Sequence, residues 1–238
     1  MGWRRPGRLD EAVTNTPEVD VSAMRREYAR VGLAEADLEA TWLDQFQRWL
    51  RDTIAAELPE PNAMILATAD VAARPSARTV LLKGLDERGF VFFTNLTSRK
   101  ATEAAANPYA SLVFPWHPIG RQVVVNGRVT LVDRADTEAY FATRPRDSQL
   151  GAWASPQSQV VAGRDVLDEA MAELEQRFAS QQPPAPPHWG GLRVTPDTVE
   201  FWQGRVGRLH DRLRFRRDET ADESASTGEA WVVERLGP

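Results

Sequence analysis

Four short basic clusters contain most of the side chains of this sequence that could do chemistry. The first is Arg78-Thr79-Val80-Leu81-Leu82-Lys83, an apolar, strand-like run with a cation at each end. Buried or half-buried arginine and lysine side chains need an anionic partner, so the run is a candidate anion site. Two solvated strand ends are the alternative. Positions 78 and 83 point to opposite faces of a flat strand, so they serve one ligand only through a twist, a bulge or different reach.

The second cluster, Ser98-Arg99-Lys100, follows the strand-like residues 90–94 and opens a predicted helix. Backbone N–H groups and the dipole at a helix start suit a phosphate, and the two cations add to them. The alternative is an ordinary helix cap with a basic first turn. Cations at that end oppose the helix dipole, which favours the anion interpretation.

The third cluster spans residues 144–149, Arg-Pro-Arg-Asp-Ser-Gln, and is followed by Gln157-Ser158. It combines rigid turn residues with donors of the kind that bind phosphate. A solvated loop explains the same residues equally well. This cluster by itself therefore leaves both interpretations open.

The fourth cluster is Trp202-Gln203-Gly204, followed by Arg208-Leu209-His210-Asp211-Arg212. On a strand, Arg208, His210 and Arg212 project from one face, and Leu209 projects from the other. Such a face is an anion-binding wall with a histidine that exchanges protons near neutral pH. A polar outer face is one alternative. An RNA-binding arginine stripe is another, which the net charge of -5 disfavours.

Composition narrows the chemistry further. The chain has 238 residues, which suggests one domain, and its net charge of -5 predicts no binding to nucleic acid or to an anionic membrane. It has no cysteine, which excludes disulfides and thiolate chemistry and fits a cytoplasmic location. The three histidines lack the spacing of a metal site, so no metal is predicted. Dinucleotide, Walker A and nucleophile-elbow motifs are absent.

The elements that must position these clusters are mostly short strands. Residues 1–20 read as a flexible tail without a signal peptide, and no apolar run is long enough to span a membrane. One domain covers residues 21–238, with a Pro-rich linker at 181–188 and a mobile loop at 218–229. Strands without a helix between each pair predict an antiparallel barrel or sandwich. The predicted strands are 63–69, 78–85, 90–94, 110–116, 121–132, 198–202, 209–216 and 230–236, and the predicted helices are 21–30, 36–58, 98–107, 136–143 and 164–179.

In this order, the clusters resemble motifs of the pyridoxine/pyridoxamine 5'-phosphate oxidase family, and the resemblance covers residues 24–238. The segment from Val199 through Arg212 resembles the family's C-terminal motif without a gap. The other matching motifs are Arg78 to Lys83, Thr94-Asn95-Leu96, Ser98-Arg99-Lys100, Phe114-Pro115-Trp116, Arg121-Gln122-Val123, Arg144 to Gln149, Gly151-Ala152-Trp153 and Trp189-Gly190-Gly191.

The resemblance implies a mainly β, antiparallel Greek-key split barrel with flanking helices that acts as a homodimer. It implies FMN at the dimer interface, with cofactor contacts from Arg78, Thr79, Val80, Leu81, Leu82, Lys83, Phe93, Thr94, Arg99, Lys100, Gln122, Gln157, Ser158, Trp202 and Arg212. It implies substrate contacts from Arg25, Arg26, Glu27, Tyr28, Lys83, Tyr140, Arg144, Ser148, Arg208, Leu209 and His210, of which Arg208 and His210 are the catalytic candidates.

The implied reaction oxidises pyridoxamine or pyridoxine 5'-phosphate to pyridoxal 5'-phosphate, with oxygen as the electron acceptor and hydrogen peroxide as a product. One departure is Phe93, where the family commonly has tyrosine, so a hydroxyl contact near FMN is expected to be missing. Two rivals remain. One is another split-barrel enzyme that reduces its substrate with FMN or a deazaflavin, and the other is a non-catalytic carrier of flavin or pyridoxal phosphate.

Overall fold

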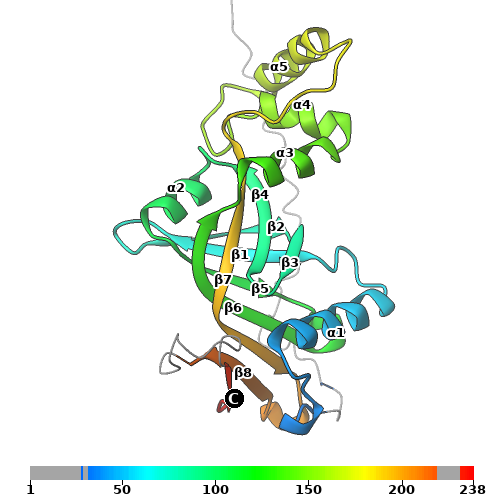
Figure 1. Ribbon diagram of the computed structural model, residues 1–238, viewed down its shortest axis with the longest axis vertical. Helices are drawn as coiled ribbons and strands as arrows, with labels where there is room; N and C mark the ends of the chain where they lie inside the picture. The colour runs from blue at the N-terminus through cyan, green and yellow to red at the C-terminus, as the bar shows by residue number, and fades with distance from the viewer. Residues whose placement is uncertain (1–27, 29–31, 219–230) are drawn as a thin grey trace, which may run out of the picture.

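The computed structural model describes residues 28, 32–218 and 231–238, and these residues form a nine-stranded antiparallel sheet (Figure 1). The strand order is β2-β1-β5-β6-β7-β4-β3, and β8 pairs with β7 and β9. The strands are β1 Ala63–Ala69, β2 Pro75–Leu81, β3 Gly84–Asp86, β4 Gly89–Asn95, β5 Tyr109–Phe114, β6 Arg121–Leu131, β7 Trp189–Gln203, β8 Asp211–Arg217 and β9 Trp231–Arg235. The predicted mainly β, antiparallel architecture is confirmed.

Helices lie at the ends and one side of the sheet (Figure 1). They are α1 Trp42–Ala55, α2 Arg99–Ala106, α3 Arg134–Ala142, α4 Arg146–Ala154 and α5 Arg164–Arg177. The last three gather at one end of β7, and β8 lies toward the other end. No helix of the described residues is both long and apolar enough to cross a membrane.

The concave face of the sheet holds the main hydrophobic core. Alternate residues of each strand point into it, and α1 adds the rings of Phe46 and Trp49, which are 0% and 1% exposed. The Phe46 ring meets Phe90 edge-on at 5.1 Å, and Trp49 meets Phe201 at 5.2 Å. Aromatic pairs in these geometries add stability beyond the area they bury, so α1 is fixed against the sheet.

The opposite face of the sheet stays partly open. Strand register aligns Ile65, Val113, Val124 and Glu200 across four strands on this face. Ile65 is 37% exposed, and its three neighbours are half-buried. We call this the outer face. Three of these four side chains are apolar, and half-exposed apolar side chains in a row are typical of a surface that another protein surface covers.

Three predicted elements differ in the structure. The helix predicted over 36–58 begins only at Trp42, because the Thr41 hydroxyl accepts from Asp44 N and caps it there. The strand predicted over 78–85 is two strands, β2 and β3. The strand predicted over 198–202 is the end of β7, which passes Pro196 at the position where its register with β6 shifts. Proline is tolerated at such a bulge because no ladder hydrogen bond is required there.

Two further features of the helices were not predicted. No helix was predicted over residues 146–154, but they form α4, which begins directly after Pro145. The predicted helix 164–179 corresponds to α5, and although α5 carries an apolar stripe, no residue within it is buried. The stripe residues Leu167, Ala170, Met171 and Leu174 are only half-buried, and Phe178, just beyond the helix, is buried.

The Pro-rich segment 181–188 contains no helix or strand, but side chains hold its backbone in place. Arg134 donates to the carbonyls of Ala185 and Pro186 at 2.6 and 3.0 Å. Trp153 Nε1 donates to the carbonyl of Pro184 at 2.8 Å. The segment is therefore attached to α3 and α4. The predicted tail at 1–20, the predicted helix at 21–30 and the loop after Asp218 lie outside the described residues, apart from Tyr28.

Candidate functional site

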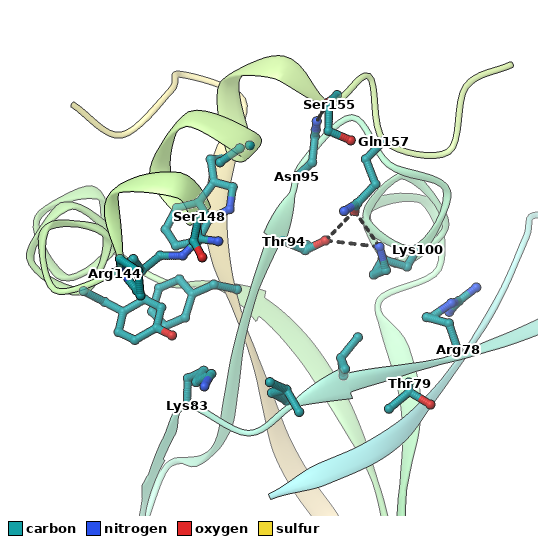
Figure 2. A pocket seen from close by; sticks show the side chains of 18 of the residues that line it. Arg78, Thr79, Lys83, Thr94, Asn95, Lys100, Arg144, Ser148, Ser155 and Gln157 are labelled. Atoms are coloured by element: carbon teal, nitrogen blue, oxygen red, sulfur yellow. Dashed lines mark hydrogen bonds between the residues drawn. The ribbon is translucent and has the colours of Figure 1, made fainter. Parts of the chain in front are cut away.

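A cavity of about 800 Å³ opens between the end of β2, β4 and helices α2, α3 and α4 (Figure 2). Its volume lies within the range of about 300–1,000 Å³ typical of small-molecule sites. We call it the cationic pocket. It brings together these predicted site residues: Arg78, Thr79, Val80, Leu81, Lys83, Phe93, Thr94, Lys100, Tyr140, Arg144, Ser148 and Gln157.

The break between β2 and β3 explains how residues of opposite parity line one pocket. Leu82 N donates to the carbonyl of Asn62, on the β1 side, whereas Lys83 N donates to the carbonyl of Val91 on β4. The chain therefore changes its neighbour between these two residues. Because the strand ends here, Arg78 and Lys83 both line the cationic pocket.

Lys100 lies on the first turn of α2, with its side chain directed back into the pocket (Figure 2). Its Nζ is 2.7 Å from Gln157 Oε1, 3.2 Å from Thr94 Oγ1 and 3.3 Å from Ser98 Oγ. All three partners are neutral oxygens. Burial of Lys100 lowers its pKa, and the nearby charge of Arg78 lowers it further. Within the described residues, Lys100 makes no ion pair with a carboxylate.

Arg144 occupies the other side of the pocket, near Lys83 and Ser148 (Figure 2). Its guanidinium lies 4.8 Å from the Trp189 ring centroid, and its NH1 is buried without a hydrogen-bond partner. Burial lowers the pKa of Arg144. A buried donor that lacks an acceptor costs about 1–3 kcal/mol, so the site favours a ligand that supplies one.

Three rings form the wall behind Arg144. Phe93 stacks on Tyr140 with centroids 4.2 Å apart, and on Trp189 at 5.2 Å. A Cβ on Gly191 would lie 2.8 Å from the Phe93 ring, so glycine leaves the space that the ring occupies. Burial raises the pKa of Tyr140, which keeps its hydroxyl protonated and able to donate.

A second group of predicted residues lies at the far end of β7. Gln122, Trp202 and Arg212 are aligned across β6, β7 and β8 on the outer face. The Trp202 ring packs against His210 at 4.7 Å and Tyr28 at 5.4 Å. We call these five residues the distal cluster. Arg212 makes two bonds to Glu200, from Nε at 2.7 Å and from NH2 at 3.0 Å.

The prediction that Arg208, His210 and Arg212 share one strand face is wrong. Strand β8 begins at Asp211, so only Arg212 of the three is on it. Arg208 lies in a tight turn with φ of 62°, next to Gly207 at 73°. His210 follows that turn, and its Nδ1 accepts from Arg205 N at 3.0 Å. Two successive left-handed residues redirect the chain, which a strand pattern does not anticipate.

Four predicted residues lie away from both groups. Leu82 is 7% exposed and belongs to the core. Arg99 pairs with Glu103 at 2.7 Å and does not line the pocket. Ser158 lies just past Gln157 with φ of 72°, and Leu209 is 73% exposed. The predicted substrate contacts Arg25, Arg26 and Glu27 are outside the described residues.

Sequence reasoning gave no site role to several residues that line the pocket, among them Asn95 and Trp189. Asn95 Nδ2 donates to the carbonyl of Ser155, which joins β4 to the end of α4. Both residues fall inside family motifs. The motifs could therefore have identified them as site residues, although no role was predicted for either. Among the described residues, no group of three or more side chains could hold a metal ion.

The cationic pocket and the distal cluster lie at opposite ends of β7. Trp189 lines the pocket, and Trp202, on the same strand, belongs to the distal cluster. A strand rises about 3.3 Å per residue, so these two positions are separated by up to about 43 Å along β7. One chain therefore presents the predicted site residues in two separate groups.

Comparison with known proteins shows two family models that together match most of the chain. The model described as "Pyridoxamine 5'-phosphate oxidase" matches residues 50–203. The model described as "Pyridoxine 5'-phosphate oxidase C-terminal dimerisation region" matches residues 189–238, which include Trp202, Arg208, His210 and Arg212.

Two curated relatives named pyridoxine/pyridoxamine 5'-phosphate oxidase illustrate the similarity. The one from Salinispora arenicola is 61% identical over 90% of this chain and 95% of its own. The one from Frankia alni is 57% identical over 92% of this chain and 89% of its own.

Solved structures agree on the fold. PhzG from Burkholderia lata, crystallised with tetrahydrophenazine-1-carboxylic acid, superimposes with a TM-score of 0.77 at 30% identity, covering 85% of this chain and 95% of PhzG. A pyridoxamine 5'-phosphate oxidase-related, FMN-binding protein from Nostoc punctiforme superimposes with a TM-score of 0.65 at 18% identity, covering 84% and 99%. The predicted split-barrel fold is thereby confirmed.

Proposed function

The chain belongs to the pyridoxamine 5'-phosphate oxidase family, and from this premise we propose that it oxidises pyridoxamine and pyridoxine 5'-phosphate to pyridoxal 5'-phosphate, with FMN as its cofactor. Relatives that carry the oxidase name are 57–61% identical over nine-tenths of the chain. The chain is accordingly an oxidoreductase of vitamin B6 metabolism. A cytoplasmic location stays a prediction.

The observation that carries the proposal is a pocket in which one cation on each of two sides, Lys100 and Arg144, lacks an anionic partner among the described residues (Figure 2). Arg78 and Lys100 lie on one side, and Lys83 and Arg144 lie on the other. Lys100 contacts neutral oxygens, and Arg144 NH1 has no acceptor. The reaction needs one phosphate from the cofactor and one from the substrate. The residues present fit both groups.

We assign the first side to FMN and the second to the substrate phosphate. Arg78, Lys100 and the Thr94 hydroxyl would bind the FMN phosphate, and Lys83, Arg144 and Ser148 would bind the substrate. Charge-assisted hydrogen bonds to phosphate are worth about 1.5–3 kcal/mol each. Because these bonds are remote from the reacting carbon, they would align the substrate rather than alter its chemistry.

The distal cluster completes the site from a second copy in this proposal. The distal cluster lies on the outer face. Thr79, which lines the pocket, pairs with Ile65 on the same face. One surface therefore carries both groups, which we treat as two half-sites. A two-fold axis through such a surface sets the distal cluster of one subunit against the pocket of the other. The matched dimerisation region includes Trp202 and Arg212, which supports this arrangement.

Within that site, Arg208 and His210 would hold the substrate ring, and Trp202 and Gln122 would contact the flavin. Bound FMN would supply the hydride acceptor and pass the electrons to oxygen, giving hydrogen peroxide. Arg208 makes no hydrogen bond or ion pair with the described residues, so its guanidinium is available to a ligand. The protein groups orient and polarise the substrate and exclude alternative geometries.

The two alternative functions require different residues in the pocket. A split-barrel enzyme acting on a substrate without phosphate would not need the cations on the Arg144 side. The ligand in the PhzG complex is a carboxylic acid without a phosphate, so a protein with this fold holds a ligand of that kind. A non-catalytic carrier would bind flavin or pyridoxal phosphate without turnover.

The decisive experiment is an absorbance spectrum of the purified protein, followed by addition of pyridoxamine 5'-phosphate under air. We expect a flavin spectrum, formation of pyridoxal 5'-phosphate and release of hydrogen peroxide. Flavin without turnover would support the carrier. Failure to bind FMN would refute the proposal.

A further inference from the structure

A buried carboxylate lies beneath the FMN side of the cationic pocket. Glu103 on α2 is 5% exposed, and its Oε1 accepts from Arg99 Nε at 2.7 Å. Its Oε2 accepts from the hydroxyls of Thr68 on β1 and Ser76 on β2, each at 2.5 Å. Burial acts to raise the pKa of Glu103, but the bonds from Ser76, Thr68 and Arg99 outweigh it and lower the pKa to about 2. The carboxylate is therefore ionised near neutral pH.

Arg78 reaches this carboxylate through the two hydroxyls. Its NH1 donates to Thr68 Oγ1 at 2.6 Å, and its NH2 donates to Ser76 Oγ. The distance from Arg78 NH2 to Glu103 Oε2 is 3.5 Å. A direct charge-assisted bond would be about 2.7–2.9 Å long, so the arginine and the carboxylate are held apart.

Proton counting determines the direction of each bond. An ionised carboxylate only accepts, and a guanidinium only donates. Each hydroxyl must therefore accept from Arg78 and donate its single proton to Glu103. The Thr68 hydroxyl is 3% exposed as part of a buried residue, so water is a poor substitute for it.

Without these hydroxyls, two acceptors remain near the Arg78 guanidinium: the Leu66 carbonyl, 3.3 Å from NH1, and the Glu103 carboxylate, 3.5 Å from NH2. Only the carboxylate is charged, so it attracts the guanidinium more strongly. Arginine and carboxylate form a two-point pair when nothing intervenes. Such a pair would draw the guanidinium toward α2 and away from the cavity that Arg78 lines. A pocket arginine neutralised in this way contributes less to an incoming phosphate.

We propose that Thr68 and Ser76 are positioning residues that hold Arg78 off Glu103 and toward the cationic pocket, where its guanidinium serves the FMN phosphate. The inference rests on the proposed function, because FMN is the ligand whose phosphate Arg78 would bind. Neither hydroxyl lines the pocket, so each acts through the arginine.

The test compares FMN with riboflavin, which has the same ring system and no phosphate. Flavin-free protein is titrated with each ligand, and binding is followed by quenching of flavin fluorescence. The variant Thr68→Val/Ser76→Ala removes both hydroxyls and leaves every charge in place. We expect its Kd for FMN to rise about 10- to 100-fold, and its Kd for riboflavin to stay at the wild-type value.

Controls separate positioning from loss of fold. Thr68→Ser and Ser76→Thr keep a hydroxyl and should bind FMN as the wild type does. Thr53→Val removes a buried hydroxyl on α1, which donates to the Trp49 carbonyl at 2.8 Å outside the pocket, and should leave both affinities unchanged. The single variant Ser76→Ala provides the measurement if the double variant does not fold.

Adding Glu103→Gln to the double variant tests the direction of the effect. With the carboxylate gone, Arg78 has no counter-charge to turn toward, so we expect part of the FMN affinity to return. A further fall in FMN affinity would overturn the role of the hydroxyls as spacers.

The remaining outcomes are distinguishable. Wild-type FMN affinity in the double variant overturns the inference while the proposed function stands. An equal loss of FMN and riboflavin also overturns it, because the hydroxyls would then support the fold rather than the phosphate site. A wild-type protein that binds neither ligand refutes the proposed function and this inference together.

Discussion

The cationic pocket and the distal cluster both contain arginines, but these arginines differ in whether a carboxylate of the same chain pairs with them. In the distal cluster, the hydrogen bond to Glu200 raises the pKa of Arg212. In the pocket, burial lowers the pKa of Arg144, whose NH1 has no acceptor. Lys83 makes no ion pair with the described part of the chain. The first arginine is satisfied by its own chain, and the second needs a ligand.

This difference suggests a criterion that separates basic residues that bind a ligand from basic residues that stabilise the fold. A paired arginine stabilises the strands it joins, and an unpaired buried cation marks a place for an anion. Arg208 is unpaired within the described residues but exposed, so this criterion does not classify it, and its contact with the substrate stays a proposal. In the proposed function, the two regions form one site when two copies meet.

The strongest test of the comparison mixes two defective variants. Lys100→Ala should weaken FMN binding about 10- to 100-fold through its pocket, and Arg208→Ala/His210→Ala should impair the opposite half-site. A mixed dimer contains one site with both halves intact. Mixed dimers isolated through two different affinity tags should recover about half of the wild-type activity per dimer, far above either parent.

Recovery in the mixed dimer would show that each site takes residues from both subunits. Activity no greater than the mean of the two parents would mean that each chain completes its own site. The matched control is a mixed dimer of two differently tagged wild-type chains, which should keep full activity.

The next largest effect should come from Arg208→Ala and His210→Ala measured separately. Neither residue lines the pocket, so both variants should keep their flavin content. Loss of about 2–4 kcal/mol of transition-state stabilisation would lower kcat/KM about 30- to 1000-fold. Arg205→Ala provides a control, because Arg205 is paired with Asp211 at 3.2 Å. If Arg208→Ala retains wild-type kcat/KM, its assignment to the substrate fails.

Arg144 and Arg146 offer a matched pair two residues apart. Arg146 donates to the carbonyls of Phe178 and Gln181 at 2.6 and 3.1 Å, whereas Arg144 NH1 has no acceptor. Arg144→Ala should therefore lower kcat/KM about 10- to 150-fold, which corresponds to one charge-assisted bond, and keep the flavin. Arg146→Ala should lower the melting temperature and change kcat/KM little. The reverse pattern would contradict the division between binding and structural arginines.

The smallest expected effect concerns acid stability. The folded-state pKa of Glu103 is about 2, below its ordinary value of 4.5, so its contribution to stability is present above pH 4.5 and is lost as the pH falls toward 2. The difference in unfolding free energy between wild type and Glu103→Gln should be constant near neutral pH and should shrink across that acid window. Chemical denaturation at several pH values measures it. A difference that instead varies near neutral pH would assign the pH dependence to other groups.

The local pattern of apolar and polar residues was sufficient to predict most of the helices and strands. The run at 63–69 alternates in burial as a half-buried strand should, and it forms β1 with the predicted bounds. The Ser98 position begins α2 as expected. Failures occurred where tertiary contacts overrode the local signal. Pro196 concealed the length of β7, and the polar composition of residues 146–154 concealed α4.

The sequence by itself determined which residue types were available: the four basic clusters, the family motifs in order, and the lack of cysteine. Only the tertiary structure decided which clusters meet. Lys83 joins Arg78 because the chain changes neighbour after Leu82, and Lys100 joins them because α2 starts beside Thr94. The fourth cluster ends up at the far end of β7. Strand pairing between residues distant in sequence sets these positions, and periodicity within a short window carries no information about it.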